Sequence, residues 1–252
     1  MHAGVLIIGS LLWDNASRRE WRSTWLQIEV ADKVTVPIRY GRVSIKRDNT
    51  YTMVFSPRAA SHHCEGTGYF VPMRRTMNSM NDLIIAAREL AQAEGLRQDN
   101  WTWGAVGILL NADRMVSAGV VGQWTRYFAE VSQACRLFDA HARNEEAVLG
   151  RDGLLRLAWP LSRGSGDPID ADVILATPTE PTLRNGRYAF AREVATAYVR
   201  ADRPEYFVRN ILSGIRTFHD RAIWKYMTLL RADWEKEYAE VGHALHERCC
   251  RA

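Results

Sequence analysis

The stretch A-G-V-L-I-I-G-S-L-L-W, residues 3–13, decides how the rest of the chain is organised. Its apolar run, residues 5–8, has the length of a strand buried on both faces, and its β-branched residues favour a strand over a helix. The run stops at Gly9-Ser10, where the conformational freedom of glycine and a small neighbour predict a tight turn with exposed N–H groups. Such a turn can hold an oxyanion or a carboxylate, although a strand and a turn without any site are the commoner case.

The composition is that of an ordinary globular protein. The chain has 252 residues, of which 47% are hydrophobic and 25% charged, enough for one large core or two small ones. The net charge of +4 is mild and the Lys and Arg residues are scattered, which argues against nucleic acid as a partner. The four cysteines are isolated or terminal, and no apolar segment reaches the length of a membrane helix. We therefore expect a reduced, cytoplasmic protein without a membrane segment.

Hydrophobic periodicity predicts a strand-rich first half. A short helix is expected from Asp14-Asn15 to about residue 26, and a longer one over residues 80–95, ended by Gly95 as a left-handed cap. The expected strands are 5–8, 34–47 with a bulge or bend at Gly41, 51–55, 66–73, and 101–111 with Trp101 and Trp103 on one face.

The second half has a different pattern. Residues 124–147 are amphipathic and predict a helix, and residues 154–160 and 172–178 predict strands. From Tyr188 onward, apolar residues recur at helical spacing almost to the end. No linker-like stretch interrupts the chain, so residues 1–252 are interpreted as a single domain.

Glu94 is the strongest candidate for chemistry. On a helical wheel of residues 82–94, Glu94 falls in the middle of the apolar stripe, whereas Glu89 falls on the opposite face. Burying a carboxylate raises its pKa, which is what a general acid or base working near neutral pH requires. The alternative is that the last turn frays at Gly95 and Glu94 meets water.

Two other constellations are weaker. The stretch His-His-Cys-Glu, residues 62–65, has no second cluster at ligand spacing, so a solvated loop is favoured over a metal site. His219-Asp220 could serve a hydrolytic triad, but Ser10 lacks the Gly-x-Ser-x-Gly setting of a nucleophile. No metal or cofactor is expected.

The glycine pairs at residues 66–68 and 164–166 lack the remaining residues of a dinucleotide fingerprint. A basic strand face is interpreted as solvated; its residues are Arg39, Arg42, Lys46 and Arg47.

Three separated stretches resemble one family. I-I-G-S-L-L, residues 7–12, is similar to the Tyr-Gly-Ser-Asn-Leu turn of the γ-glutamylcyclotransferase-like family, and I-R-Y-G-R-V-S, residues 38–44, follows as it does there. A-E-G-L, residues 93–96, lies where that family carries its catalytic glutamate. Y-F-V-R-N-I-L-S-G-I-R, residues 206–216, followed by Tyr226, resembles the family's closing helix.

The resemblance implies an α+β fold, a small mixed β-barrel flanked by helices, with a helical C-terminus. The strands up to residue 110 would then belong to one sheet or barrel, with helices over 204–230 packed on it. Residues from about 114 to 170 have no counterpart in the family and would be an insertion within the single domain.

The resemblance also implies an activity: conversion of a γ-glutamyl amine or peptide to 5-oxoproline and a free amine by attack of the α-amino group, with Glu94 as general acid/base. The substrate-binding residues would be those of the turn, namely Ile8, Gly9, Ser10, Leu11 and Leu12. The family's Tyr and Asn are replaced by Ile8 and Leu11, so backbone N–H groups from Gly9 to Leu12 would carry the binding. Glu94 should then be partly buried, face the same cavity as Ser10, have a raised pKa, and have no Arg or Lys at close range.

Two rival functions remain open. One is a non-catalytic small-molecule-binding protein on the same scaffold, whose sign would be Glu94 turned to solvent or salt-bridged into the frame. The other is a nucleic-acid-associated protein, which the scattered charge does not favour. The sequence leaves the number of subunits open.

Overall fold

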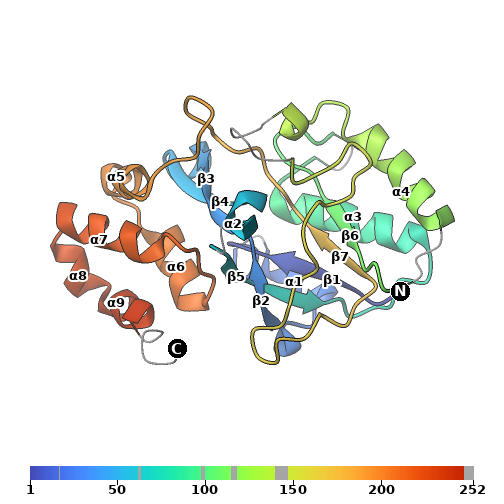
Figure 1. Cartoon of the computed structure of the whole chain (residues 1–252), viewed down its shortest axis with the longest axis horizontal. Helices are drawn as coiled ribbons and strands as arrows, with labels where there is room; N and C mark the ends of the chain where they lie inside the picture. The colour runs from blue at the N-terminus through green and yellow to red at the C-terminus, as the bar shows by residue number, and fades with distance from the viewer. Residues whose placement is uncertain (17, 62–63, 98–99, 115–117, 140–146, 247–252) are drawn as a thin grey trace.

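The computed structural model describes the whole chain except residues 17, 62–63, 98–99, 115–117, 140–146 and 247–252. It is an α+β protein (Figure 1). The strands are β1 (Ala3–Ile7), β2 (Asp32–Val36), β3 (Ile38–Ser44), β4 (Thr50–Phe55), β5 (Gly66–Pro72), β6 (Gly107–Leu110) and β7 (Val173–Ala176). The α-helices are α1 (Arg19–Trp25), α2 (Pro57–Ser61), α3 (Met80–Glu94), α4 (Ala118–Val131), α5 (Ala191–Ala201), α6 (Glu205–Ser213), α7 (Asp220–Leu230), α8 (Asp233–Glu237) and α9 (Ala239–His246).

A five-stranded mixed sheet forms the centre, in the order β2-β5-β1-β7-β6. Strand β1 is its middle strand: it pairs antiparallel with β5 and parallel with β7, and all five of its residues are buried. The apolar run that opens the chain is therefore confirmed as a strand covered on both faces. In Figure 1, α3 and α4 lie on one side of the molecule and α5 to α9 on the other.

The expected barrel is wrong, because no closed barrel forms among the described residues. Strands β3 and β4 pair only with each other, as a separate two-stranded sheet. The predicted strand 34–47 is divided at Pro37, which has no N–H to donate to a ladder, so β2 joins the main sheet and β3 leaves it. The predicted bend at Gly41 is confirmed as a register shift between Tyr40 and Arg42.

Helix α3 matches the prediction at both ends. The Ser79 hydroxyl accepts from the Asp82 N–H, and the Asp82 carboxylate accepts from the Ser79 N–H in return. Gly95 ends the helix with φ +82°, the left-handed conformation that glycine adopts without strain. Glu94 is thus the last residue of the helix.

Several expected elements are shorter or absent. Helix α1 begins only at Arg19, because the Asp14 carboxylate instead accepts from the Ala16 N–H in a turn. The predicted strand 101–111 is reduced to β6, and Trp101 is buried against Tyr127 and Phe128 of α4. In the predicted strand 154–160, only Leu154 and Leu155 form isolated bridges and the remaining residues have no regular structure.

The predicted helix over residues 124–147 ends at Val131, and residues 140–146 of that prediction lie outside the described part of the chain. The segment proposed as an insertion, residues 114–170, connects β6 to β7, which are antiparallel neighbours in the sheet. That position is compatible with an insertion, which stays a prediction.

The C-terminal helices pack against the β3–β4 sheet through aromatic side chains. Tyr40 of β3 contacts Tyr198 of α5 and Tyr206 and Phe207 of α6, with ring centroids 5.9 to 6.5 Å apart. Burial of such rings contributes strongly to stability. Helix α6 also lies beside the residues that follow β1, because Tyr206 is next to Gly9. None of the helices in the described ranges combines the length and the apolar character that crossing a membrane requires.

Candidate active site

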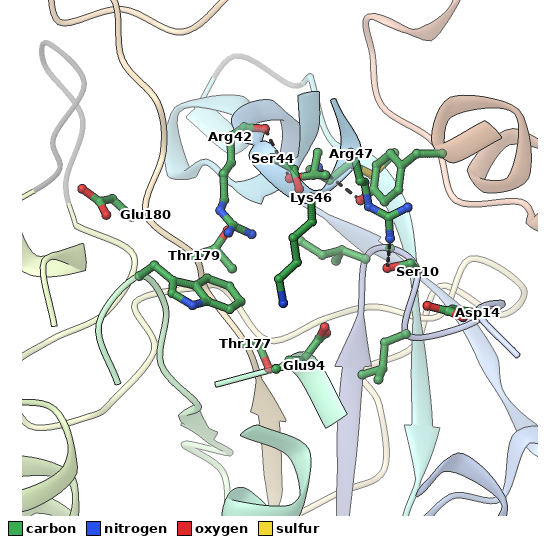
Figure 2. A pocket seen from close by; sticks show the side chains of 18 of the residues that line it. Ser10, Asp14, Arg42, Ser44, Lys46, Arg47, Glu94, Thr177, Thr179 and Glu180 are labelled. Carbon is green, nitrogen blue, oxygen red and sulfur yellow. Dashed lines mark hydrogen bonds between the residues drawn. The ribbon is translucent and has the colours of Figure 1, made fainter. Parts of the chain in front are cut away.

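A cavity of about 1030 Å³ opens at the end of β1. It is bounded by the opening turn, the end of β3 with the short 3-10 helix Ile45–Arg47, the C-terminus of α3, and the segment that follows β7 (Figure 2). Tyr206 of α6 also contributes to its wall. Its size is that of a small-molecule site.

The opening turn lines this cavity and keeps backbone donors available. Within the described residues, no hydrogen-bond acceptor lies against the N–H groups of Gly9, Ser10 or Leu11, and these residues line the cavity together with Ile8. Leu12 differs from the prediction: its N–H donates to the Gly9 carbonyl at 3.0 Å, and it does not line the cavity. The turn closes into one helical turn at Leu12, which uses that donor internally.

Glycine is needed at position 9 because Tyr206 lies too close for a larger side chain. Its backbone angles do not require glycine, since its φ lies outside the left-handed region. A Cβ at this position would lie 2.7 Å from the Tyr206 hydroxyl oxygen. Helix α6 is further anchored by the Trp13 indole, which donates to the Asn210 side-chain oxygen at 2.8 Å. The third stretch of the resemblance therefore meets the first, whereas Tyr226 is 38% exposed and does not line the cavity.

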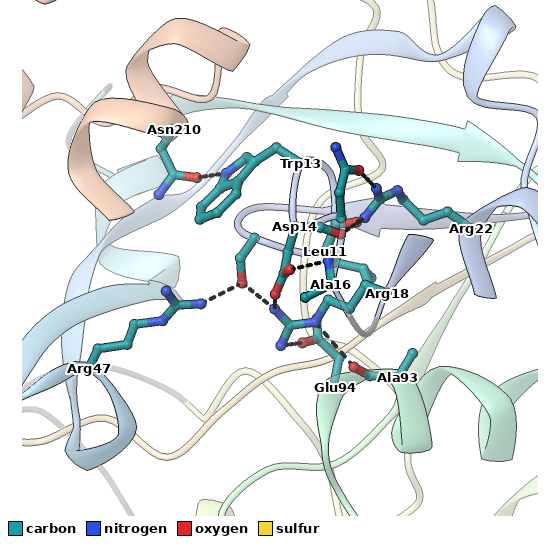
Figure 3. A network of polar contacts seen from close by, with 12 residues as sticks. Leu11, Trp13, Asp14, Ala16, Arg18, Arg22, Arg47, Ala93, Glu94 and Asn210 are labelled. Carbon is teal, nitrogen blue, oxygen red and sulfur yellow. Dashed lines mark hydrogen bonds and ion pairs between the residues drawn. The ribbon is translucent and has the colours of Figure 1, made fainter. Parts of the chain in front are cut away.

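Glu94 faces the same cavity as Ser10, as predicted, and its side chain is 21% exposed. The expectation that no Arg or Lys lies close to it is wrong. The Arg18 Nη2 atom lies 3.0 Å from Glu94 Oε2 (Figure 3). The wheel places Glu94 on the inner face but carries no information about Arg18, which reaches it across 76 residues of chain.

Arg18 is shared among several acceptors. Its Nε donates to the Ala93 carbonyl at 3.1 Å, and its Nη1 donates to Ser10 Oγ at 2.6 Å and to Asp14 Oδ2 at 3.1 Å (Figure 3). The guanidinium group thus ties the opening turn to the C-terminus of α3. Because it keeps these bonds, it would stay in place if Glu94 exchanged partners.

The electrostatics of Glu94 combine two opposing effects. Burial raises the pKa of the carboxyl, whereas the charges of Arg18, Arg42 and Arg47 lower it. Burial is the larger effect, so the pKa of Glu94 is raised above its ordinary value, as predicted. The pKa of Glu94 is thus shifted in the direction that proton transfer requires, while its carboxylate forms an ion pair with Arg18.

A basic wall lines the cavity, and it is formed by Arg42, Lys46 and Arg47. The prediction of a solvated face is confirmed for Lys46, which is exposed, whereas Arg42 and Arg47 are partly buried where they line the cavity. The bulge at Gly41 places Arg42 opposite Thr52, in the cavity wall, whereas Tyr40 is fully buried. A strand pattern with strict alternation could not show this change of face.

The two arginines of the basic wall have distinct contacts. The Arg47 Nη2 atom donates to Ser10 Oγ at 3.2 Å, and its guanidinium carbon lies 4.8 Å from the centroid of the Tyr206 ring. The Arg42 guanidinium carbon lies 4.1 Å from the centroid of the Trp103 ring. Arg39, the fourth basic residue of the predicted face, stacks on Tyr188 outside this cavity.

The segment T-P-T-E, residues 177–180, completes the wall and was missed by the sequence reasoning. It follows β7, which runs parallel to β1, so both strands end at the same cavity. The Thr177 hydroxyl is buried without a hydrogen-bond partner in the described residues, and Glu180 pairs with Arg136 at 3.3 Å. A strand end followed by Thr and Glu was the available signal.

The remaining candidates do not join the site. His219 and Asp220 do not line the cavity of Ser10; Asp220 instead accepts from the N–H and hydroxyl of Thr217 at the start of α7. Burial lowers the pKa of His219 to about 4. In the described ranges no three His, Cys, Asp or Glu side chains gather as metal ligands, and residues 62–63 of the His-His-Cys-Glu stretch lie outside those ranges.

Comparison of the chain with protein-family models, with curated proteins and with solved structures returns no match.

Proposed function

We propose that this cavity binds a γ-glutamyl amine or γ-glutamyl peptide and converts it to 5-oxoproline and a free amine, with Glu94 transferring the protons. The observation that carries the proposal is the meeting of Glu94 and the opening turn at one cavity, where the turn offers unpaired N–H groups and the carboxyl has a raised pKa. The motif resemblance supplies the reaction type.

The charges of the cavity suit a zwitterionic substrate. An α-carboxylate would be held by the N–H groups of Gly9 to Leu11 and by the guanidinium of Arg47, which already reaches Ser10. The α-ammonium group would replace Arg18 as the partner of Glu94. Arg18 retains its bonds to Ser10, Asp14 and Ala93 during this exchange.

The reaction moves two protons, one after the other, from the attacking nitrogen to the leaving nitrogen. Glu94 would take a proton from the α-ammonium group, which frees the nitrogen to attack the γ-carbonyl carbon and close a five-membered ring. The carbonyl oxygen gains negative charge, which nearby N–H donors stabilise, and the attacking nitrogen still carries one extra proton. The leaving nitrogen receives the first proton from Glu94 as its bond to carbon breaks. Glu94 then takes the extra proton from the ring nitrogen and passes it to the free amine, which leaves as an ammonium ion. Holding the chain bent supplies much of the acceleration, since oriented intramolecular attack reaches effective molarities on the order of 10⁵ M or more.

A second candidate function is binding without turnover on the same scaffold. The Arg18–Glu94 ion pair favours it, because a carboxylate kept by a guanidinium is a poorer proton acceptor than a free one. The two candidates differ in whether Glu94 releases Arg18 when the ligand is bound.

The experiment is incubation of the purified protein with a panel of γ-glutamyl amides and peptides, with 5-oxoproline measured by mass spectrometry. Glu94→Gln preserves the shape of the side chain and removes its proton transfer, so turnover should fall by roughly 10²- to 10⁴-fold while calorimetry still detects binding. Glu89→Gln is the matched control, because Glu89 lies on the same helix and does not line the cavity. Equal turnover by both variants would refute the role of Glu94, and binding without 5-oxoproline would establish the second candidate.

A further inference from the structure

We propose that Arg42 and Lys46 form an anion subsite that selects γ-glutamyl compounds whose leaving amine carries a carboxylate or a phosphate. The proposal rests on the proposed function for the identity of the substrate, but it concerns the part of the cavity that the glutamyl group leaves unoccupied. Arg42 and Lys46 act here as specificity-determining residues.

The cavity has two ends with different contents. Figure 2 shows Ser10, Asp14 and Arg47 at one end, Glu94 at its floor, and Arg42, Thr179 and Glu180 at the other end. The Lys46 side chain extends between the two ends toward Glu94 (Figure 2). A glutamyl group held at the turn would therefore direct its γ-amide substituent toward Arg42 and Lys46.

Positive charge in this cavity exceeds what its carboxylates neutralise. Asp14 and Glu94 both pair with Arg18, and Glu180 pairs with Arg136. Within the residues that the structure describes, neither Arg42 nor Lys46 has a carboxylate within ion-pair distance. A cavity with unpaired cations at one end favours a ligand with a negative group at that end.

Arg42 is built to receive such a group. Its guanidinium carbon lies over the Trp103 ring, 4.1 Å from the ring centroid. A guanidinium group packed on an aromatic ring keeps the N–H groups at its edge available for an anion. Burial lowers the pKa of Arg42, which means that its charge is held in the wall at a cost that a bound anion would offset.

Lys46 approaches from the other side of the same space. Its Nζ atom lies 4.0 Å from where a Cβ on Gly95 would be, so the ammonium group reaches the C-terminus of α3. A bound anion between Arg42 and Lys46 would thus lie near the amide nitrogen that leaves. The α-carboxylate of a glutamyl group cannot bind to the opening turn and to Arg42 and Lys46 at the same time, so a second anionic group is needed to occupy the subsite.

The experiment compares paired ligands in which the leaving amine either carries or lacks an anionic group. γ-Glutamyl-phosphoethanolamine and γ-glutamylethanolamine form one pair, γ-glutamylglycine and γ-glutamylmethylamide a second, and γ-glutamyl-ethylenediamine is the cationic arm. Binding is measured by calorimetry on Glu94→Gln protein, in which turnover is suppressed, and kcat/KM is measured on protein with Glu94 intact. The two pairs distinguish phosphate from carboxylate as the preferred anion.

We expect the anionic member of at least one pair to bind roughly tenfold more tightly than its neutral partner, and the cationic ligand to bind least. Lys46→Gln should reduce that preference roughly two- to fivefold, as expected for a partly exposed ion pair, and Arg42→Gln should reduce it further. Lys225→Gln removes the same charge from the exposed surface of α7 and should leave the preference unchanged. Raising the salt concentration should weaken the preference.

Equal affinity for the charged and neutral members of both pairs would overturn the subsite, whatever the activity. An anion preference in binding that Lys46→Gln weakens, together with no 5-oxoproline from any ligand, would refute the proposed reaction and leave the subsite standing. If Arg42→Gln does not fold, Lys46→Gln decides the outcome, because Lys46 is exposed on a short 3-10 helix and its loss removes no buried contact.

Discussion

The contact between Gly9 and Tyr206 gives the sharpest test of the structure. Gly9→Ala adds a Cβ that would lie 2.7 Å from the Tyr206 hydroxyl oxygen, but 3.6 Å from the ring carbon that carries it, which is ordinary contact. The clash therefore comes from one oxygen atom. Because the backbone at Gly9 is not left-handed, alanine introduces no conformational strain there.

The magnitude follows from where that oxygen is held. The Tyr206 hydroxyl accepts from the Met53 N–H at 3.3 Å, and Tyr206 lies on a helix packed on Tyr40, so it cannot move freely. Gly9→Ala should cost about 1–3 kcal/mol, the usual cost of overpacking. Tyr206→Phe alone should cost about 0.5–1.5 kcal/mol for the lost hydrogen bond.

Urea unfolding of the four proteins of the double-mutant cycle checks the reasoning. In the Tyr206→Phe background the oxygen is gone, so Gly9→Ala should cost little, and the double variant should be more stable than the sum of the single changes predicts. The same cost for Gly9→Ala in both backgrounds would show that the turn does not meet Tyr206 through its hydroxyl.

Three further predictions concern stability. Gly95→Ala should cost about 1 kcal/mol through strain alone, because φ is +82° and the nearest atom to the new Cβ is Lys46 Nζ at 4.0 Å; a loss much larger than this in urea unfolding would indicate a clash instead. Burial raises the pKa of Glu94, so the folded state binds its proton more tightly than the unfolded state does. The free energy of unfolding, relative to that of Glu94→Gln, should therefore fall as the pH rises from 4.5, the ordinary pKa of Glu, through the raised pKa. A rise of this difference over the same pH range would contradict the shift. The hydrogen bond from Arg187 lowers the pKa of Glu193 to about 2, so the stability that Glu193→Gln removes, up to about 1 kcal/mol, should be present above pH 4.5 and vanish as the pH falls toward 2 in an acid titration.

Local patterns predicted the elements whose boundaries are set by local chemistry. Strand β1 follows from a run of apolar residues that ends at Gly9, and helix α3 from apolar spacing closed by Gly95. The position of Glu94 toward a cavity also follows from the helical wheel. Its partner does not, because Arg18 approaches from a turn whose shape depends on Asp14 accepting hydrogen bonds inside it.

The predictions of a barrel and of a strand at Trp101 were wrong because both features depend on contacts between residues that are distant in the sequence. Trp101 has the β-branched and apolar neighbours of a strand, but its indole is buried among Tyr127 and Phe128, so packing against α4 overrides propensity. Likewise, Pro37 divides one apolar pattern into two strands, β2 and β3, which belong to different sheets. The apolar pattern alone does not show which strand each of them pairs with.

The topology explains why half of the site was visible in the sequence and half was not. Strands β1 and β7 are parallel neighbours, and a parallel pair requires a crossover in place of a tight turn. Here the connection between the two strands runs from Ile8 to Asp172, so the segment T-P-T-E, residues 177–180, comes to line the same cavity as the opening turn only in the folded protein. Carboxyl ends of neighbouring parallel strands are where open sheets bind ligands, because both chains turn away there and leave backbone groups exposed. Gly9-Ser10 marks the opening turn as a candidate site in the sequence itself. The end of β7 becomes part of the site only because β7 pairs with β1 in the folded protein.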